Sequence, residues 1–434
     1  MNNLSSLFYL IVSTEDHRLL VKGGIGTYLG LLYQAFQQNR PNVHMIWLTE
    51  SPTNRFISVR EGNCRILYIP KPNLILKIEH AAEKIVKLVT SNPHNKLIIE
   101  APDWEGILSN LYSHVHNTNV LKITRLHSIL ELTKQLHPTF SAEEQLQIQR
   151  EHKELIYSDI LSAPTNYVYN FTRNLIKEIA SIPVCIIPNF INNHFEDTSL
   201  ISRKKACAFY NQHIKNHKIN EKDTNIFVIG SLEYRKGTDL AIKIAKKIIS
   251  KNKNVHFYFF GHYEINGNSL TLNQKYSLKA LNAMISKQYS SNIHICGYFN
   301  YGDLKFIYSA CDTFLFTYRH DNFPGALIEA CLSGKNIVYL FRGGCPEIMC
   351  MNEQYLGIPF DGHTDTEIVE NGVYAVQKSL SEPNVHIAQG IKDKYKLSDI
   401  LQQMENTDFS AITNISQIAS VFKKLRPKIW STNS

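Results

Sequence analysis

The sequence lacks any apolar run approaching the roughly 18–20 residues that a membrane-spanning helix needs, so any membrane contact is expected to be peripheral. Its eight cysteines lie far apart and form no Cys-x-x-Cys pair, which argues against the common zinc and redox motifs. The thiols are therefore expected to be buried and reduced, as in a cytosolic protein. The first residues lack the basic region of a signal peptide and are expected to form a β-strand.

Long runs of one charge are also missing. Lys and Arg number 46 against 38 Asp and Glu, which gives a net charge of +8, but the basic residues are scattered along the chain. No segment is typical of a nucleic-acid-binding arm, and no nucleic-acid partner is expected. The mild basic excess is compatible with a phosphorylated small molecule or with an anionic membrane surface.

Short runs of β-branched and aromatic residues alternate with helix-like segments throughout the 434 residues. This alternation predicts an α/β protein with two doubly wound parallel-sheet domains. We expect these domains at 1–190 and 191–395, followed by a partly helical tail at 396–434 that could pack back on the first domain. The predicted strands are 7–13, 43–49, 64–70, 96–101, 120–127, 159–165, 225–231, 255–261, 293–299, 312–318 and 336–341. In such sheets ligands bind beyond the carboxyl ends of the strands, so functional residues are expected in the loops that follow them.

A glycine-rich turn, with Gly23, Gly24 and Gly26, follows the first predicted strand and precedes an amphipathic helix. Glycine lets the backbone approach a ligand closely, and the N–H groups at a helix start favour anions. The spacing is neither G-x-G-x-x-G nor that of a Walker A loop. A purely structural turn is an equally good interpretation.

Polar residues follow two further strands of the first half. Asp103 comes after the strand that ends near Ala101, and His127 closes the next one. A histidine at the carboxyl end of a buried parallel strand faces the cleft, where it could bind a sugar hydroxyl or a carbonyl. Taken alone, a hydrogen-bonded histidine at a sheet edge explains His127 better.

In the second half, the stretch GSLEYRKG (230–237) places Arg235 and Lys236 in a tight turn between a strand and a helix. A phosphate is the natural partner of a lysine in this position, because a compact ammonium can neutralise a leaving diphosphate. A solvated turn lysine is the alternative.

The stretch HDNFPGALIEA (320–330) has two carboxylates, Asp321 and Glu329, on either side of a predicted helix start. Pro324 suits the first position of a helix that is expected to run to about Ser333. The N–H groups from Gly325 onward would then face the cleft. An extended ligand could place a diphosphate at the helix start, with one end near each carboxylate. A second Gly-Gly turn, in YLFRGGCPEIM (339–349), follows the same logic.

Together these motifs resemble the retaining glycosyltransferases of family four, whose GT-B fold consists of two Rossmann-like domains. The resemblance runs through the Gly23–Gly26 loop, His127, the linker IPNFIN (187–192), GSLEYRKG (230–237), the element that ends in Glu329-Ala330, and GGCPEI (343–348). It implies a retaining, metal-independent hexosyl transfer without a cofactor. The implied donor is a UDP- or GDP-linked sugar, and the implied acceptor is a glycan or a lipid-linked molecule in surface polysaccharide or lipopolysaccharide synthesis. The implied location is the cytoplasm, compatible with attachment to the cytoplasmic face of a membrane.

The resemblance also assigns roles to residues. Glu329 would bind the ribose, Lys236 the leaving diphosphate, Asp321 the donor sugar, and His127 the sugar near its reacting carbon. The residues implied as catalytic are His127, Lys236 and Asp321. The residues implied as donor-binding are Gly24, Ser231, Arg235, Lys236, Asp321, Phe323, Pro324, Gly325, Ala326, Leu327 and Glu329. The residues implied on the acceptor side are Gly23, Gly26 and Asp103.

Two departures from the family pattern leave alternatives open. Ser231 stands where the family usually has Arg, and Asp321 stands where it usually has Glu. A catalytically weak or inactive GT-B protein, acting as a nucleotide-sugar-binding or partner subunit, is therefore the second hypothesis. A nicotinamide-dependent oxidoreductase ranks last, because the first strand is not followed by G-x-G-x-x-G.

Overall fold

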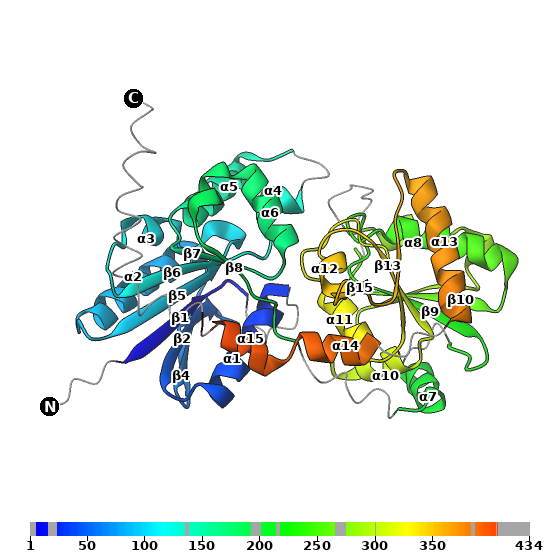
Figure 1. Ribbon diagram of the computed structural model, residues 1–434, viewed down its shortest axis with the longest axis horizontal. Coiled ribbons are helices and arrows are strands. Elements are labelled where there is room, and N and C mark those ends of the chain that lie inside the picture. Colours follow the sequence, from blue (N-terminus) through cyan, green and yellow to red (C-terminus); the bar gives the residue numbers. More distant parts are fainter. Residues whose placement is uncertain are drawn as a thin grey trace. The chain divides into compact units, whose positions relative to one another are not determined.

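The computed structural model describes residues 6–15, 24–134, 139–191, 201–213, 218–264, 275–299, 301–382, 387–404 and 406. Contacts divide the chain into two compact units (Figure 1). The first unit comprises Met1–Phe190 and the end of the chain from Leu397, and the second comprises Ile191–Lys396.

The first unit is built on an eight-stranded sheet with the order β3-β4-β2-β1-β5-β6-β7-β8. All neighbouring strands are parallel except β3 and β4, which form an antiparallel edge. The strands are β1 (Leu7–Val12), β2 (Val43–Glu50), β3 (Ile57–Glu61), β4 (Cys64–Ile69), β5 (Lys96–Pro102), β6 (Val120–Arg125), β7 (Ile160–Ala163) and β8 (Val184–Ile186). The helices are α1 (Gly24–Asn39), α2 (Leu74–Thr90), α3 (Ser109–His114), α4 (Leu130–Thr133), α5 (Ala142–Ile156), α6 (Asn166–Leu175) and α15 (Leu397–Met404).

The centre of this sheet is buried on both faces, which explains why its strands are almost continuously apolar. Strand β6 is buried at every position, including two cations. The Lys122 ammonium donates to the backbone carbonyl of Tyr112 at 3.1 Å, and the Arg125 guanidinium donates to Ser162 at 2.6 Å. Both cations tolerate burial because protein oxygens replace the water that they lose.

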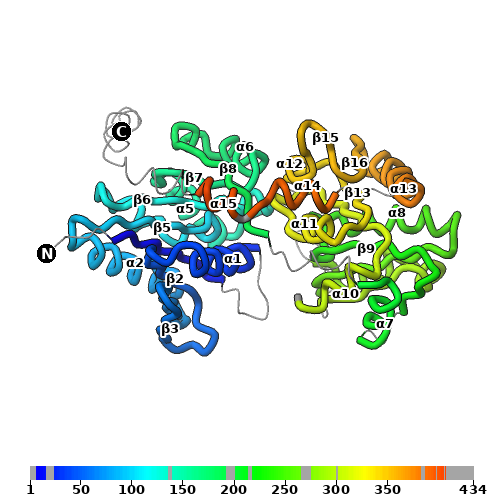
Figure 2. The backbone as a smooth tube through the Cα atoms, turned by 60° about the horizontal axis from the view of Figure 1, so that its bottom comes forward, coloured from blue at the N-terminus to red at the C-terminus, as the bar shows by residue number. Residues whose placement is uncertain are grey.

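The second unit has a six-stranded sheet, parallel throughout, with the order β11-β10-β9-β12-β13-β16. Its strands are β9 (Thr224–Ile229), β10 (Val255–Phe260), β11 (Ile293–Gly297), β12 (Thr313–Phe316), β13 (Asn336–Leu340) and β16 (Ile358–Phe360), beside a small hairpin of β14 (Cys350–Met351) and β15 (Gln354–Tyr355). Its helices are α7 (Arg203–His213), α8 (Thr238–Lys251), α9 (Leu278–Ile285), α10 (Leu304–Ser309), α11 (Gly325–Leu332), α12 (Cys345–Met349), α13 (Asp365–Ser381) and α14 (Ile387–Lys394). Helices α8 and α13 pack together against this sheet, as Figure 2 also shows.

Both sheets reverse their strand order at one point, between β1 and β5 in the first unit and between β9 and β12 in the second. At such a switch point the loops beyond the carboxyl ends of the two strands diverge and leave room for a ligand. In the second unit these loops contain Lys236 and Asp321. The fold therefore brings together two of the residues selected from the sequence.

The predicted α/β fold with two doubly wound domains is confirmed by the two sheets. Several predicted strand boundaries were wrong, because strands end before the polar residues that follow them. The strand predicted at 120–127, for example, is β6, which ends at Arg125 and leaves His127 in the loop. The edge strands β3 and β8 and the 17-residue helix α13 were missed. Edge strands carry a weak pattern, since β3 alternates between half-buried and exposed positions.

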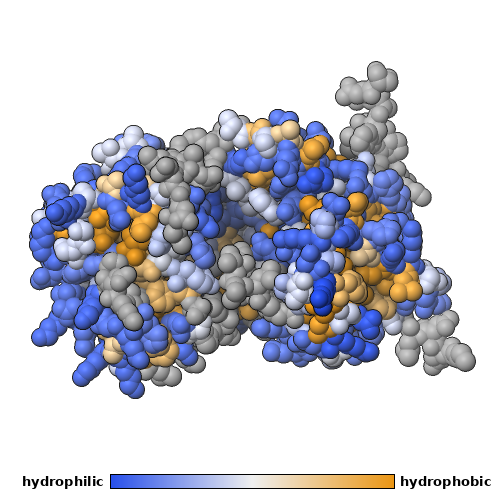
Figure 3. All heavy atoms as spheres, turned by 180° about the vertical axis from the view of Figure 1, so that it is seen from behind, coloured by the Kyte–Doolittle hydropathy of each residue, from blue (hydrophilic) through white to orange (hydrophobic). Residues whose placement is uncertain are grey.

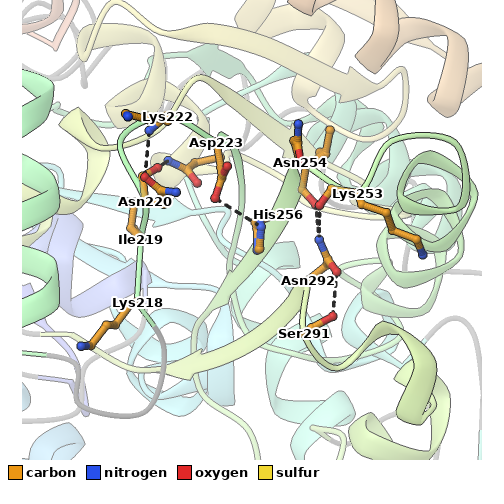
Figure 4. Close-up of polar contacts among 12 residues, drawn as sticks. Lys218, Ile219, Asn220, Lys222, Asp223, Lys253, Asn254, His256, Ser291 and Asn292 are labelled. Atoms are coloured by element: carbon orange, nitrogen blue, oxygen red, sulfur yellow. Dashed lines mark hydrogen bonds and ion pairs between the residues drawn. The ribbon is translucent and has the colours of Figure 1, made fainter.

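The opposite edge of the second sheet, where the strands begin, is closed by local polar contacts (Figure 4). The Asn292 side chain donates to the backbone carbonyl of Lys253 at 2.8 Å and accepts from Ser291 at 2.8 Å. His256 lies 3.6 Å from the Asp223 carboxylate across the starts of β9 and β10. These contacts fix the strand starts and leave the carboxyl ends as the place for a site.

The face of the molecule shown in Figure 3 is mainly hydrophilic, with smaller hydrophobic areas between the polar side chains. All eight cysteines are free thiols, and five of them are buried. Within the described ranges, none of the helices combines the length and the apolar character needed to cross a membrane.

Candidate functional site

In the second unit, the loop after β9 and the loop after β12 touch at the switch point. Gly237 adopts φ +67°, and a Cβ atom there would lie 1.9 Å from the carbonyl oxygen of Thr317. The Thr317 hydroxyl in turn donates to the Gly237 carbonyl at 2.8 Å. Only glycine permits this backbone approach, which places the neighbouring Lys236 against the second loop.

Lys236 and Asp321 form an ion pair at this contact, with side chains that are 15% and 12% exposed. The Lys236 ammonium also lies over the ring of Tyr318, 4.2 Å from its centroid. Burial raises the pKa of Asp321, but the positive charges of Lys236 and Arg235 outweigh burial and hold it below the usual range. The carboxylate is therefore ionised at neutral pH.

Two glycines hold the main chain of Asp321 from the other side. Gly343 has φ +63°, and a Cβ atom there would lie 2.5 Å from the Asp321 carbonyl oxygen. The Gly344 amide donates to the same oxygen at 2.7 Å. The second Gly-Gly turn thus serves to position Asp321, a role that its sequence alone did not indicate.

Helix α11 begins directly after Pro324, which agrees with the predicted helix. Gly325 at its start is exposed and Ala326 is half-buried, whereas Leu327 is buried and its amide donates to the Pro324 carbonyl at 3.0 Å. The first amides of a helix have no partner within it, so those of Gly325 and Ala326 can receive an anion.

Further along α11, Glu329 is half-buried and accepts a hydrogen bond from the Tyr308 hydroxyl at 3.1 Å. It follows Gly325 by four residues, or about 6 Å along the helix axis. Before the helix, the ring of Phe323 packs edge-on against Tyr395, with centroids 5.9 Å apart. Glu329 and the helix start are therefore close enough for one extended ligand to reach both.

The loop after β9 also carries Ser231 and Arg235, both half-buried. The Arg235 guanidinium donates to the Glu233 carboxylate at 2.6 Å and to the backbone carbonyl of His320 at 3.3 Å. Burial, with help from Arg235, lowers the pKa of His320 to about 4. His320 is therefore neutral at pH 7, and the positive charge here comes from Arg235 and Lys236.

Arg319 is a residue that the sequence did not single out. Its guanidinium forms a fork onto the Asp239 carboxylate, at 2.6 and 2.8 Å, and reaches Asp365 at 2.9 Å. It also donates to the Tyr234 carbonyl at 2.9 Å and lies 3.8 Å above the Tyr234 ring. Arg319 thereby joins the two loops to the starts of α8 and α13, and no local motif signals this long-range role.

The first unit holds the remaining predicted residues, of which Gly23 lies outside the described residues. Helix α1 begins at Gly24, where a Cβ atom would meet nothing within 4 Å. The Gly26 amide donates to the Glu15 carboxylate at 2.8 Å. The start of α1 thus binds a carboxylate of its own chain.

Asp103 is completely buried beneath the loop that carries His127. One of its carboxylate oxygens accepts from the backbone amides of His127, at 2.8 Å, and Ser128, at 3.1 Å. Burial raises the pKa of Asp103 to about 7, against the effect of these amides. In this conformation Asp103 positions the loop, and its predicted acceptor-side role stays a prediction.

The His127 ring lies edge-on to the ring of Tyr28, 5.3 Å between centroids. Burial, followed by the charge of Arg125, lowers the pKa of His127 to about 3, so that the imidazole is neutral at pH 7. Tyr28 also donates to the buried Glu100 at 2.9 Å and accepts the Arg125 guanidinium on its face at 4.7 Å. No role was predicted for Glu100, Tyr28 or Arg125, although they fix the surroundings of His127.

The raised pKa of Asp103 leads to a prediction about stability. Because the folded state keeps its proton up to about pH 7 while the unfolded state loses it near pH 4, Asp103 makes the folded state less stable as pH rises between these values. Asp103→Asn keeps an oxygen for the two amides and removes the charge. We compare the free energies of unfolding of Asp103→Asn and of the native protein. The variant's value minus the native value should be about 2–3 kcal/mol larger at pH 8 than at pH 5.

Urea unfolding at several pH values measures this difference, and the titration of other groups cancels between the two proteins. A difference that is independent of pH would contradict the assigned cause.

A second prediction concerns Arg319, which is 7% exposed beside an Asp239 carboxylate that is 12% exposed. Arg319→Ala leaves that buried carboxylate without its partner and should lower the free energy of unfolding by about 3–5 kcal/mol. Arg319→Lys should retain only part of the stability that Arg319→Ala loses, because an ammonium lacks the fork geometry of a guanidinium.

Lys247→Ala is the matched control, since the exposed pair of Lys247 and Glu370 also joins α8 to α13. It should cost about 1 kcal/mol or less. Equal losses in Arg319→Ala and Lys247→Ala, measured by urea unfolding at pH 7, would exclude a special role for Arg319.

The second unit is similar in sequence to one family of known proteins. Residues 210–398, which span most of the second unit, match the family model described as "Glycosyl transferases group 1". No sequence among the curated proteins matches the chain well enough to count as a relative.

Solved structures resemble the whole chain. Sucrose-phosphate synthase from Thermosynechococcus elongatus is 16% identical, with 99% of this chain and 100% of that chain covered and a TM-score of 0.65. Anabaena HepE, solved in complex with UDP, is 15% identical over 93% of this chain and 100% of that chain, with a TM-score of 0.61. The Escherichia coli trehalose-6-phosphate protein bound with UDP-2-fluoro glucose is 13% identical over 96% and 98% of the two chains, with a TM-score of 0.61.

At these identities the solved structures establish the fold, and the family model identifies the second unit. The model covers the loops that carry Lys236 and Asp321 and the helix that carries Glu329. Residues 210–398 of the chain thus match the glycosyl transferases group 1 family, and the chain as a whole has the two-domain GT-B fold of the similar solved structures.

Proposed function

We propose that the chain transfers a hexosyl group, with retention of configuration, from a nucleoside-diphosphate sugar to a glycan or a lipid-linked acceptor. The main support is the ion pair of Lys236 and Asp321 at the switch point of the second sheet, in the same unit as the start of α11. The proposed pathway is the synthesis of surface polysaccharide or lipopolysaccharide.

The diphosphate is proposed to bind to Lys236, Arg235 and the first amides of α11. An ammonium, a guanidinium and helix N–H groups together stabilise the negative charge that develops as the diphosphate leaves. Each cation already has a carboxylate partner, Glu233 for Arg235 and Asp321 for Lys236. Lys236 is proposed as the main contact of the diphosphate, because Arg235 also donates to the backbone carbonyl of His320. Ser231 cannot supply the charge that an arginine has in related enzymes.

The two carboxylates are assigned to the two ends of the donor. Glu329 accepts hydrogen bonds from the ribose hydroxyls, and Tyr308 orients it by donating at 3.1 Å. Asp321 accepts from hydroxyls of the donor sugar, and being one methylene shorter than glutamate it reaches less far. Phe323 and Pro324 line the turn between these carboxylates.

In the first unit, neutral His127 is proposed to contact the donor sugar near its reacting carbon, as a hydrogen-bonding group rather than as an acid. Gly24 would border the diphosphate. The domain 1–190 is proposed to take the acceptor, with Gly23, Gly26 and Asp103 on that side.

The chemical step forms a bond between the acceptor oxygen and the anomeric carbon on the face from which the diphosphate departs. The bond between that carbon and the diphosphate oxygen breaks, and the diphosphate oxygen takes the acceptor proton. Side chains then need only stabilise charge and hold both substrates in place. No side chain has to exchange a proton.

Uridine diphosphate is favoured as the nucleotide, and guanosine diphosphate is the second choice. Two similar structures were solved with UDP or a UDP-linked sugar bound, which supports a uridine donor by analogy. The net charge of +8 is compatible with work at the cytoplasmic face of an anionic membrane, where a lipid-linked acceptor would be found.

The second candidate function is a nucleotide-sugar-binding or partner subunit with weak or no activity. Ser231 favours it, because the loop lacks one phosphate-binding charge, and Arg235 is engaged elsewhere. Such a protein would bind a nucleotide sugar without transferring or hydrolysing it.

Substitution of the two donor contacts tests the proposal. Lys236→Ala should lower kcat about 10²–10³-fold, because it removes charge stabilisation at the leaving diphosphate. Glu329→Ala should mainly raise the KM for the donor, because the ribose contact is present before and during the reaction. Transfer is measured from labelled nucleotide sugars to a mixture of lipid-linked and soluble glycan acceptors.

Lys243→Ala is the control, since this lysine lies on α8 close to the site but is 52% exposed and pairs with Asp239 and Asp365 only at 3.5–3.6 Å. It should transfer at the native rate. Full activity in both Lys236→Ala and Glu329→Ala would overturn the assignment, and nucleotide-sugar binding without turnover by the native protein would favour the partner subunit.

A further inference from the structure

We propose that Asp321 competes with the diphosphate for Lys236. In the free protein its carboxylate neutralises the Lys236 ammonium, and it takes the ammonium back as the nucleoside diphosphate leaves. This inference rests on the proposed function, because it assumes that a diphosphate binds at Lys236. It gives Asp321 a second role, in product release, beside its contact with the donor sugar.

The first support is the pair itself. Both side chains are largely buried, at 15% and 12% exposure, so that water screens their attraction only weakly. Any diphosphate that uses Lys236 must therefore share or replace a carboxylate that is already in contact with the ammonium.

The second support is that Asp321 cannot easily move away. Its carbonyl oxygen is held by the Gly344 amide at 2.7 Å, and Gly343 packs against its backbone without room for a side chain. The short side chain then leaves the carboxylate little freedom. The main chain that carries the competing charge is therefore held in place.

The third support is that the lysine is confined as well. The ring of Tyr318 lies 4.2 Å from the ammonium, and the two loops are joined by the backbone amide of Arg319, which donates to the Arg235 carbonyl at 3.0 Å. A diphosphate therefore meets Lys236 beside Asp321 and cannot draw the lysine far from it.

Donor and product should respond to this arrangement in opposite ways. The donor loses part of its attraction to Lys236 but gains the contact between its sugar and Asp321. The product has no sugar, so it faces only the competition. Asp321 thus weakens product binding selectively, which suits an enzyme whose turnover depends on release.

Calorimetric titration of the full chain with UDP and with GDP tests the inference. Asp321→Asn removes the charge at nearly constant volume, and it should bind the nucleoside diphosphate about 5–20-fold more tightly than the native protein, because Lys236 becomes available. In transfer assays the same variant should be slower and more strongly inhibited by its product. Asp321→Ser, which removes the charge and shortens the side chain, must show the same sign of change in affinity.

Two controls separate competition from other effects. In the Lys236→Met background, the further change Asp321→Asn should alter the affinity for the nucleoside diphosphate by about twofold or less, since there is no ammonium to release. Asp361→Asn removes a half-exposed carboxylate of the same unit, paired with Arg342 at 3.0 Å, and should leave the affinity unchanged.

The outcomes are distinct. Unchanged or weaker binding of UDP and GDP by both Asp321 variants, with measurable binding by the native protein, would overturn the inference and leave the proposed function standing. A native protein that binds no nucleoside diphosphate would overturn the proposed function itself. An equal gain in nucleoside-diphosphate affinity in Asp361→Asn would mean that the change in net charge causes the gain, and it would also contradict the inference.

Discussion

The site in the second unit depends on one close backbone contact, between Gly237 and the carbonyl of Thr317. Because no side chain separates the two loops, the residues next to this contact are brought together: Lys236 on one side and the segment leading to Asp321 on the other. Arg319 reinforces the contact by donating hydrogen bonds to the Asp239 carboxylate and to the Tyr234 carbonyl. The cations and carboxylates of the site therefore have fixed positions before any ligand arrives, as electrostatic stabilisation of a leaving group requires.

In the first unit, two neighbouring loops are joined by a buried carboxylate, that of Asp103. Asp103 follows β5 and accepts from the amides at His127 and Ser128, which follow β6. In both units, then, a residue from one loop fixes the backbone of its neighbour. The two sites differ in charge. Arg319 is neutralised by two carboxylates, whereas Asp103 forms no ion pair within the described residues and keeps a raised pKa.

The sequence was informative where the physics is local. Near-continuous apolar strands predicted both parallel sheets, and Pro324 predicted the start of α11 to within one residue. Lys236, Asp321 and Glu329 could therefore be selected from the sequence and its resemblance to a family. The role of Arg319 could not be predicted, since its partner Asp239 is 80 residues away.

The missed positions follow the same logic. Gly343 carries no sign that it packs on Asp321, because that contact depends on how β12 and β13 pair. Likewise the burial of Asp103 could not be predicted, since burial of a carboxylate is decided by the amides that surround it in the fold.

The central claim is that the second unit binds a nucleoside diphosphate at Lys236 and α11. Ligand binding to the folded state raises its melting temperature by mass action, so a thermal-shift titration of the native protein with uridine and guanosine diphosphates and their sugars tests the claim most directly. A rise in melting temperature that increases with the concentration of at least one of these compounds is the expected result. A flat response to all of them, up to millimolar concentration, would contradict the account.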